Sequence, residues 1–146
     1  MVGVDGSPGA QCALEWAITE AAVRKTSLLA VHVWAPPDPV SGIGSLLVPL
    51  EAEPYELRAK QLLEDAISRA LADRSGSPPM IVPTIARGYA PTELVEAAKG
   101  AQLLVVGTRG LREIRSWLLG SVSRECLHRA DCAVAVVPHQ EDGSVT

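Results

Sequence analysis

Two short glycine-containing segments in the last third of the chain have the residue types that bind phosphate. The first, Gly107-Thr108-Arg109-Gly110, follows an apolar run, and the second, Gly120-Ser121-Val122-Ser123, stands at the predicted start of a helix. Glycines leave main-chain N–H groups accessible, serines add hydroxyl donors, and a helix N-terminus carries positive partial charge. Any one of these glycines alone could simply turn the chain, and Ser121 alone could simply cap the helix. Because they occur together, we expect a phosphate site here.

The same region is the one basic segment of the sequence. The chain has a net charge of −4, yet residues 107–129 contain five arginines and two glutamates, so this segment is +3 and the remainder is −7. An acidic protein with one basic segment favours a single anionic ligand over general nucleic-acid binding. Arg112 and Arg115 could neutralise phosphates or could be solvated loop residues, and the sequence leaves both roles open.

Asp5 is the acidic residue of the predicted site. It follows the first apolar run, in Gly3-Val4-Asp5-Gly6-Ser7, where its negative charge disfavours the close approach of a dinucleotide's pyrophosphate. The alternative role for Asp5 is a solvated cap on the helix that follows. The glycine spacing here differs from the dinucleotide-binding fingerprint, and the sequence contains no G-x-x-x-x-G-K-[ST] segment, which excludes the Walker type of phosphate loop.

Alternating strands and helices are expected to position these residues. Continuous apolar runs, typical of parallel strands buried on both faces, lie at residues 1–4, 28–34, 80–85, 103–106 and 133–137. Between them the periodicity is helical, with a first helix capped by Ser7 and begun by Pro8, a second opened by Pro54, a third after Pro91, and a fourth over 120–129. This order predicts an α/β fold, an open three-layer sandwich in which ligands bind outside the carboxyl ends of the strands.

The spaced glycine motif resembles that of a known family. The pattern Gly107-x2-Gly110-x9-Gly120-Ser121 is similar to the G-x2-G-x9-G-[ST] signature of ATP-binding universal stress proteins. Three further segments resemble the same family in the same order: residues 2–7, the Val31-His32-Val33 run and residues 133–138. The resemblance covers residues 1–138 as one domain. It implies a five-stranded parallel sheet of order 3-2-1-4-5 with four helices, and ATP at the carboxyl ends of strands 1 and 4 with Mg²⁺ held mainly by phosphates and water.

The resemblance also implies a role for each site residue. Asp5 would lie beside the nucleoside, with Gly3 and Val4 on the same wall, and the main chain of Val33 would meet the adenine edge. The ribose and phosphates would be followed by Gly107, Arg109 and Gly110, and the phosphate tail would be held by Gly120, Ser121, Val122 and Ser123. Neither a catalytic residue nor a protein metal ligand is expected.

The favoured function is an ATP-binding regulatory module of a stress response, with a regulatory protein partner that the sequence does not identify. Phosphoryl transfer needs a positioned base, and beyond Asp5 the region offers no carboxylate or histidine at a convincing spacing, which leaves at most slow ATP hydrolysis. A second alternative is an adenylyl-transfer enzyme of related architecture, but the His-rich or Ser-Gly-Gly motif typical of such enzymes does not follow the first run. A third alternative, a nucleotide-free interaction scaffold, is disfavoured by the intact glycine motif.

Composition favours one soluble, cytoplasmic domain. The chain has 146 residues, 47% hydrophobic and 21% charged, without an apolar stretch long enough for a membrane span and without a signal-peptide pattern. Cys12, Cys126 and Cys132 have no C-x-x-C spacing, so we expect buried small hydrophobes rather than disulfides, zinc ligands or redox groups.

Four further segments carry expectations of their own. The first strand begins at Met1, several residues shorter than the resembled family shows, and the proline-rich stretch 35–53 is idiosyncratic and either disordered or a lid. Residues 139–146 are predicted to be a flexible tail. The fifth strand carries no charge and would be a sheet edge, so a homodimer through residues 133–137 is expected, with a tail folded over that edge as the alternative.

Overall fold

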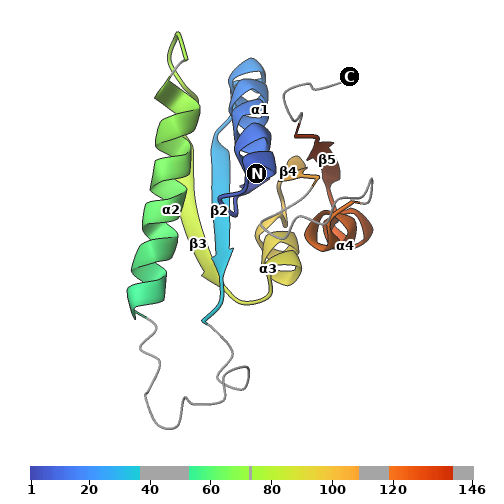
Figure 1. Ribbon diagram of the computed structural model, residues 1–146. Coiled ribbons are helices and arrows are strands. Elements are labelled where there is room, and N and C mark those ends of the chain that lie inside the picture. The colour runs from blue at the N-terminus through green and yellow to red at the C-terminus, as the bar shows by residue number, and fades with distance from the viewer. Residues whose placement is uncertain (37–52, 73, 109–118, 140–146) are drawn as a thin grey trace, which may run out of the picture.

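Runs of Val, Leu and Ala form a fully parallel sheet in the computed structural model, which describes residues 1–36, 53–72, 74–108 and 119–139 (Figure 1). The strands within these ranges are β1 (Val2–Gly3), β2 (Leu28–Trp34), β3 (Ile81–Arg87), β4 (Leu103–Gly107) and β5 (Ala133–Val137). The helices are α1 (Pro8–Arg24), α2 (Glu53–Ala72), α3 (Ala90–Ala97) and α4 (Ser121–Arg129). All pairings are parallel and the strand order is β3-β2-β1-β4-β5, which confirms the predicted fold class.

Helix α1 begins as the sequence predicts. The Ser7 hydroxyl accepts a hydrogen bond from the Ala10 N–H at 3.1 Å, and Pro8 occupies the first turn, where its missing N–H has no partner to lose. The helix ends at Lys25, which has a left-handed conformation with φ 52°.

Helices cover both faces of the sheet. On one face α1 and α2 pack against a core that includes Val2, Leu14, Ile18, Leu63 and Val105. On the other face α3 and α4 pack side by side over a second core of Val31, Leu94, Ala98, Leu104, Val106 and Cys126. Figure 1 shows this division, with α2 alongside β2 and β3 while α3 and α4 lie together on the opposite side. The layers therefore match the predicted sandwich.

Two strands differ in length from the prediction. β1 is shorter than residues 1–4, because the paired positions are only Val2 with Ala30 and Val105, and Gly3 with Val31. β3 is longer than residues 80–85, because it pairs with β2 along its whole length, from Leu28 with Ile81 to Trp34 with Arg87. The apolar run alone could not show where β3 ends, because β3 is the edge strand of the sheet, and an edge strand tolerates polar side chains and a proline such as Pro83.

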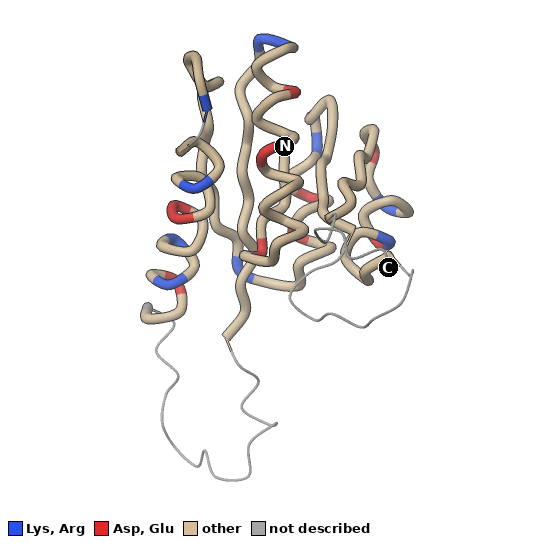
Figure 2. The backbone as a smooth tube through the Cα atoms, turned by 45° about the horizontal axis from the view of Figure 1, so that its top comes forward, with Lys and Arg blue, Asp and Glu red and all other residues tan. Residues whose placement is uncertain are grey.

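Helix starts differ slightly from the prediction. α2 begins at Glu53, so Pro54 lies in its first turn, and α3 begins at Ala90, so Pro91 also lies in the first turn rather than before it. α4 begins at Ser121, with Gly120 as the N-cap residue. Charged residues of both signs lie along α2, as expected for a helix with a solvated face (Figure 2).

Several predicted features lie outside the described residues. These are residues 37–52 of the proline-rich stretch, Arg109 and Gly110 of the glycine motif, Arg112 and Arg115, and residues 140–146 of the predicted tail.

Candidate functional site

A small cavity opens at the carboxyl ends of β1, β2 and β4, where the strand order reverses. It has a volume of about 110 Å³ and is lined by Gly3, Val4, Asp5, Ala10, Val31, Val33, Ala90, Leu94, Val106, Gly107, Val122 and Ser123. The lining is mostly apolar, with Asp5 as its charged side chain. Pockets for whole small-molecule ligands are commonly about 300–1,000 Å³, so this cavity fits one ring-sized part of a ligand whose remainder extends beyond it.

Most of the residues predicted for the site are brought together here. Seven of the eleven line the cavity, from four separate segments of the chain: Gly3, Val4, Asp5, Val33, Gly107, Val122 and Ser123. Gly120 and Ser121 immediately precede Val122 at the start of α4. Arg109 and Gly110 lie outside the described residues, so the structure gives no position for them.

Asp5 stands in the turn between β1 and α1. Its Oδ1 atom accepts a hydrogen bond from the Ser7 N–H at 2.9 Å, and Gly6 between them has φ +84°, a left-handed conformation that glycine adopts without strain. The alternative role of Asp5, the N-cap of α1, is wrong, because the Ser7 hydroxyl caps this helix. Asp5 is half-buried and lines the cavity.

Gly107 lies where the end of β4 approaches the start of α1. A Cβ atom at this position would stand 2.7 Å from the Gly9 carbonyl carbon and 2.8 Å from its oxygen. The absence of a side chain therefore allows α1 to pack closely against β4. The Gly107 carbonyl accepts a hydrogen bond from the Ser123 hydroxyl at 2.6 Å, so this buried serine joins β4 to α4.

The N-terminus of α4 is next to the cavity. Gly120 is the N-cap residue and makes no side-chain cap, and the first turn contains no acidic residue. The first intrahelical bond in this turn runs from the Arg124 N–H to the Gly120 carbonyl at 3.0 Å, so the N–H groups before Arg124 are free of the helical ladder. The Gly120 N–H itself donates to the Thr108 carbonyl at 2.8 Å, which ties the start of α4 to the residue that follows β4. This geometry can bind an anion.

Val33 contributes a different kind of group. The Val4 N–H donates to the Val31 carbonyl at 2.8 Å, so Val31 directs its main-chain groups toward β1. Alternate residues of a strand face the same neighbour, and the main-chain groups of Val33 therefore also face the β1 side, beyond the last paired residue of β1. Main-chain donors and acceptors at this position can recognise the polar edge of a ring.

Sequence reasoning missed part of the lining. Ala10, Val31, Ala90, Leu94 and Val106 line the cavity without having been predicted. Leu94 closes one wall: a Cβ atom on Gly3 would lie 3.0 Å from its Cδ1 atom. The available signal was the position of Ala90 shortly after β3, because ligands of open parallel sheets bind beyond the carboxyl ends of the strands.

A polar cluster joins α3 and α4 next to Ala90. The Tyr89 hydroxyl donates to Glu125 Oε1 at 2.6 Å, and Arg129 contacts Glu125 Oε2 at 3.4 Å and the Thr92 hydroxyl at 3.2 Å. The hydrogen bond to Glu125 raises the pKa of Tyr89 above its usual value. Glu125 is half-buried and its partners Tyr89 and Arg129 are exposed, so the cluster links the two helices near the surface.

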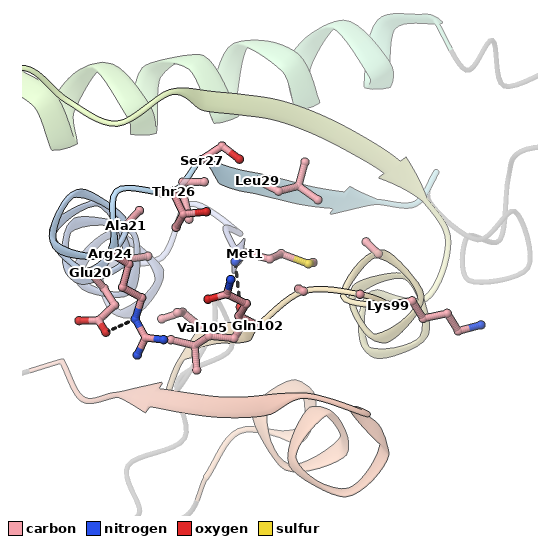
Figure 3. A pocket seen from close by; sticks show the side chains of 16 residues that line it. Met1, Glu20, Ala21, Arg24, Thr26, Ser27, Leu29, Lys99, Gln102 and Val105 are labelled. Carbon is pink, nitrogen blue, oxygen red and sulfur yellow. Dashed lines mark hydrogen bonds and ion pairs between the residues drawn. The ribbon is translucent and has the colours of Figure 1, made fainter.

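A larger cavity of about 330 Å³ lies at the opposite end of the sheet (Figure 3). Its walls include Met1, the end of α1 and the first residues of β2 and β4, which extend beyond the two residues of β1. Its cationic side chains are engaged with acids: Arg24 with Glu20 at 2.6 Å, and Lys99, which points away from the cavity in Figure 3, with Glu96. The Met1 ammonium group donates to the Leu103 carbonyl at 2.8 Å. We favour the smaller cavity as the functional site, since ligands of open parallel sheets bind at the carboxyl ends of the strands.

The cysteines and the described acidic groups give no sign of a metal site. Cys12, Cys126 and Cys132 are free thiols, and Cys126 is fully buried, which raises its pKa above the usual value. Cys12 and Cys132 are only half-buried, so the expected burial holds for one of the three. In the described ranges, no three His, Cys, Asp or Glu side chains are grouped to hold a metal. The described helices include none with both the length and the apolar character of a membrane span.

The fold and the cavity define the class of protein. The chain is an open α/β sandwich with a parallel sheet and a small, ring-sized cavity at the point where strand order reverses. A family model described as the universal stress protein family matches residues 1–138. This chain belongs to the universal stress protein family.

Curated relatives and solved structures agree with this assignment. The chain is 34% identical to universal stress protein Rv2623 of Mycobacterium tuberculosis over 97% of its own length and 48% of that protein. It is 35% identical, with the same coverage, to a universal stress protein of Mycolicibacterium smegmatis. The chain thus spans about half the length of these curated relatives. A universal stress protein solved in complex with cAMP is 28% identical, with a TM-score of 0.66 and coverage of 95% of this chain and 94% of that one.

Proposed function

We propose that this chain is an adenine-nucleotide-binding regulatory module, with ATP as its ligand, that serves a stress response. The observation that supports it most is the convergence of Asp5, the Val33 main chain and the start of α4 around one small apolar cavity. The cAMP complex of the 28% identical family member is consistent with a nucleotide ligand.

Each part of ATP has a matching group in this proposal. The ring-sized apolar cavity takes the adenine, and the main chain of Val33 meets its polar edge. The Asp5 carboxylate accepts hydrogen bonds from the ribose hydroxyls. The N–H groups that open α4, together with Arg109 and Gly110, bind the phosphates. Mg²⁺ is held by phosphates and water, because Mg²⁺ in such sites commonly keeps several waters.

The proposed function is binding of the nucleotide without its hydrolysis. Asp5 is the acidic residue that lines the cavity, and it faces the ribose position rather than the terminal phosphate in this arrangement. Slow hydrolysis by a bound water remains the alternative activity. In a regulatory module, nucleotide occupancy of the site changes the surface that a protein partner binds. The proposal also includes a homodimer that forms through β5.

Replacing Gly120 with valine tests the phosphate site. Gly120 has φ −58° and ψ 155°, a conformation that valine adopts readily, so the fold is expected to survive. The branched side chain would occupy the space beside the first N–H groups of α4, and calorimetry should show at least a hundredfold weaker ATP binding, on the order of 3 kcal/mol.

A control for this experiment checks the fold: circular dichroism and thermal unfolding of the Gly120→Val variant should match the parent. A separate experiment tests the choice of ATP by competition with AMP and cAMP, because contacts with the phosphate tail should make ATP the tightest ligand. Equal ATP affinity of variant and parent would contradict the phosphate site, and tighter binding of cAMP than ATP would contradict the choice of ATP.

A further inference from the structure

We propose that His32 is a positioning residue of the nucleotide site: by holding the carbonyl group of Val4, it fixes where Asp5 stands. The inference rests on the proposed function for its effect on ligand affinity. It assigns no contact between His32 and the ligand.

The contact itself is short and buried. His32 lies on β2, 8% exposed, and its Nδ1 atom is 2.7 Å from the Val4 carbonyl oxygen. Because a carbonyl oxygen can only accept, Nδ1 carries the proton and donates it. The Val4 N–H donates in turn to the Val31 carbonyl at 2.8 Å. Two successive residues of β2 therefore hold both main-chain polar groups of Val4.

Holding the Val4 carbonyl also orients Asp5. The carbonyl of Val4 and the N–H of Asp5 belong to one planar peptide unit, so fixing the oxygen fixes the plane from which the Asp5 Cα departs. On the far side, the Asp5 carboxylate accepts from the Ser7 N–H at 2.9 Å, and Ser7 caps α1. Asp5 thus lies between two fixed points, one set by β2 and one by α1.

Loss of the His32 donor would leave the Val4 carbonyl group without the hydrogen bond that fixes its orientation. A buried carbonyl without its donor is unfavourable, and the peptide plane can rotate to recover a partner. That rotation would turn the Asp5 Cα and move its carboxylate relative to the cavity. Main-chain freedom at Gly6, φ +84°, offers little resistance to such a movement.

The test compares donor-containing and donor-free side chains at position 32. His32→Phe keeps a ring but removes the donor, and His32→Leu is a second donor-free variant for the case in which the phenyl ring does not fit. His32→Asn places an amide N–H at the same distance from Cβ as Nδ1. Calorimetry with Mg-ATP should show about tenfold weaker binding for the donor-free variants and binding within about threefold of the parent for His32→Asn.

A double-mutant cycle separates positioning from general stability. In an Asp5→Ala background, His32→Phe should weaken ATP binding by less than about threefold, because the group that it positions is absent. Leu63→Ala is the stability control: Leu63 is buried in the α2 side of the core, so this variant should unfold at lower temperature yet bind ATP like the parent.

A ligand-free measurement completes the design. The Ser7 amide is hydrogen-bonded to Asp5, so its hydrogen exchange in the nucleotide-free protein should be faster in His32→Phe and parent-like in His32→Asn. If the parent binds ATP and His32→Phe binds it equally tightly, the inference is overturned and the proposed function stands. If the parent binds no nucleotide, the proposed function is overturned and this inference with it.

Discussion

Gly107 illustrates how a single missing side chain sets the spacing of two elements. A Cβ atom there would stand 2.7 Å from main-chain atoms of Gly9, and main-chain atoms cannot rotate away as the end of a side chain can. Gly107→Ala should therefore destabilise the fold by about 1–3 kcal/mol, the usual range for overpacking. Urea unfolding followed by circular dichroism measures this loss.

Gly3→Ala is the matched control for Gly107→Ala. The added Cβ atom at Gly3 would meet the Leu94 side chain at 3.0 Å, and this flexible side chain can shift by a few tenths of an ångström. We expect a smaller destabilisation at Gly3 than at Gly107. Equal effects at both positions would show that the contact with Gly9 is not what restricts Gly107.

At the scale of elements, β5 is the uncharged edge of the sheet. The Thr108 N–H donates to the Val137 carbonyl, so residues 133, 135 and 137 direct their main-chain groups toward β4, and Val134 and Val136 direct theirs away from β4. Pairing with a second copy would use these outward groups. Val136→Pro removes an outward N–H without removing a bond to β4, and should give monomers in sedimentation experiments.

The side chain of Val136 determines the choice of control for this experiment. Val136 is half-buried against the α3 and α4 side of the core, so a charged replacement would disturb packing as well as pairing. Val136→Thr keeps the outward N–H and should remain dimeric. A wild-type protein that is monomeric at micromolar concentration would contradict pairing through β5.

At the scale of the whole molecule, nucleotide binding should raise the free energy of unfolding. A ligand that binds only the folded state at one hundred times its Kd adds about 2.7 kcal/mol. For a chain of this size that corresponds to a rise in Tm of roughly 5–10 °C. ATP and ADP should produce this rise in a thermal unfolding experiment, and GTP should produce a much smaller one, since the Val33 main chain is proposed to select adenine.

The prediction that the site selects adenine can be wrong even if the protein binds nucleotides. Equal rises in Tm with GTP and ATP would contradict selection of adenine while leaving the phosphate site in place. No rise with any nucleotide at millimolar concentration would contradict the proposed function itself.

Much of the architecture follows from local sequence. Solid Val, Leu and Ala runs predicted all five strands, and the Ser7-Pro8 pair predicted the start of α1, because strand burial and helix capping depend on neighbouring residues in the chain. Most of the cavity lining that was predicted follows strand ends or opens α4. Such positions meet at the carboxyl ends of the strands in any parallel sheet, so their grouping could be expected from element order, whereas Gly3, Val4 and Val33 were named from the family resemblance.

Other features depended on how distant segments align. The register of β1 with β2 brings Val4 within reach of His32, and the approach of α1 to β4 requires glycine at position 107. The packing of α3 places Leu94 and Ala90 in the cavity wall, and the packing of α4 joins Ser123 to Gly107. The sequence by itself determined which elements form and in what order. Only the tertiary structure decided these contacts, because each depends on the relative position of two segments far apart in the chain, which no local pattern specifies.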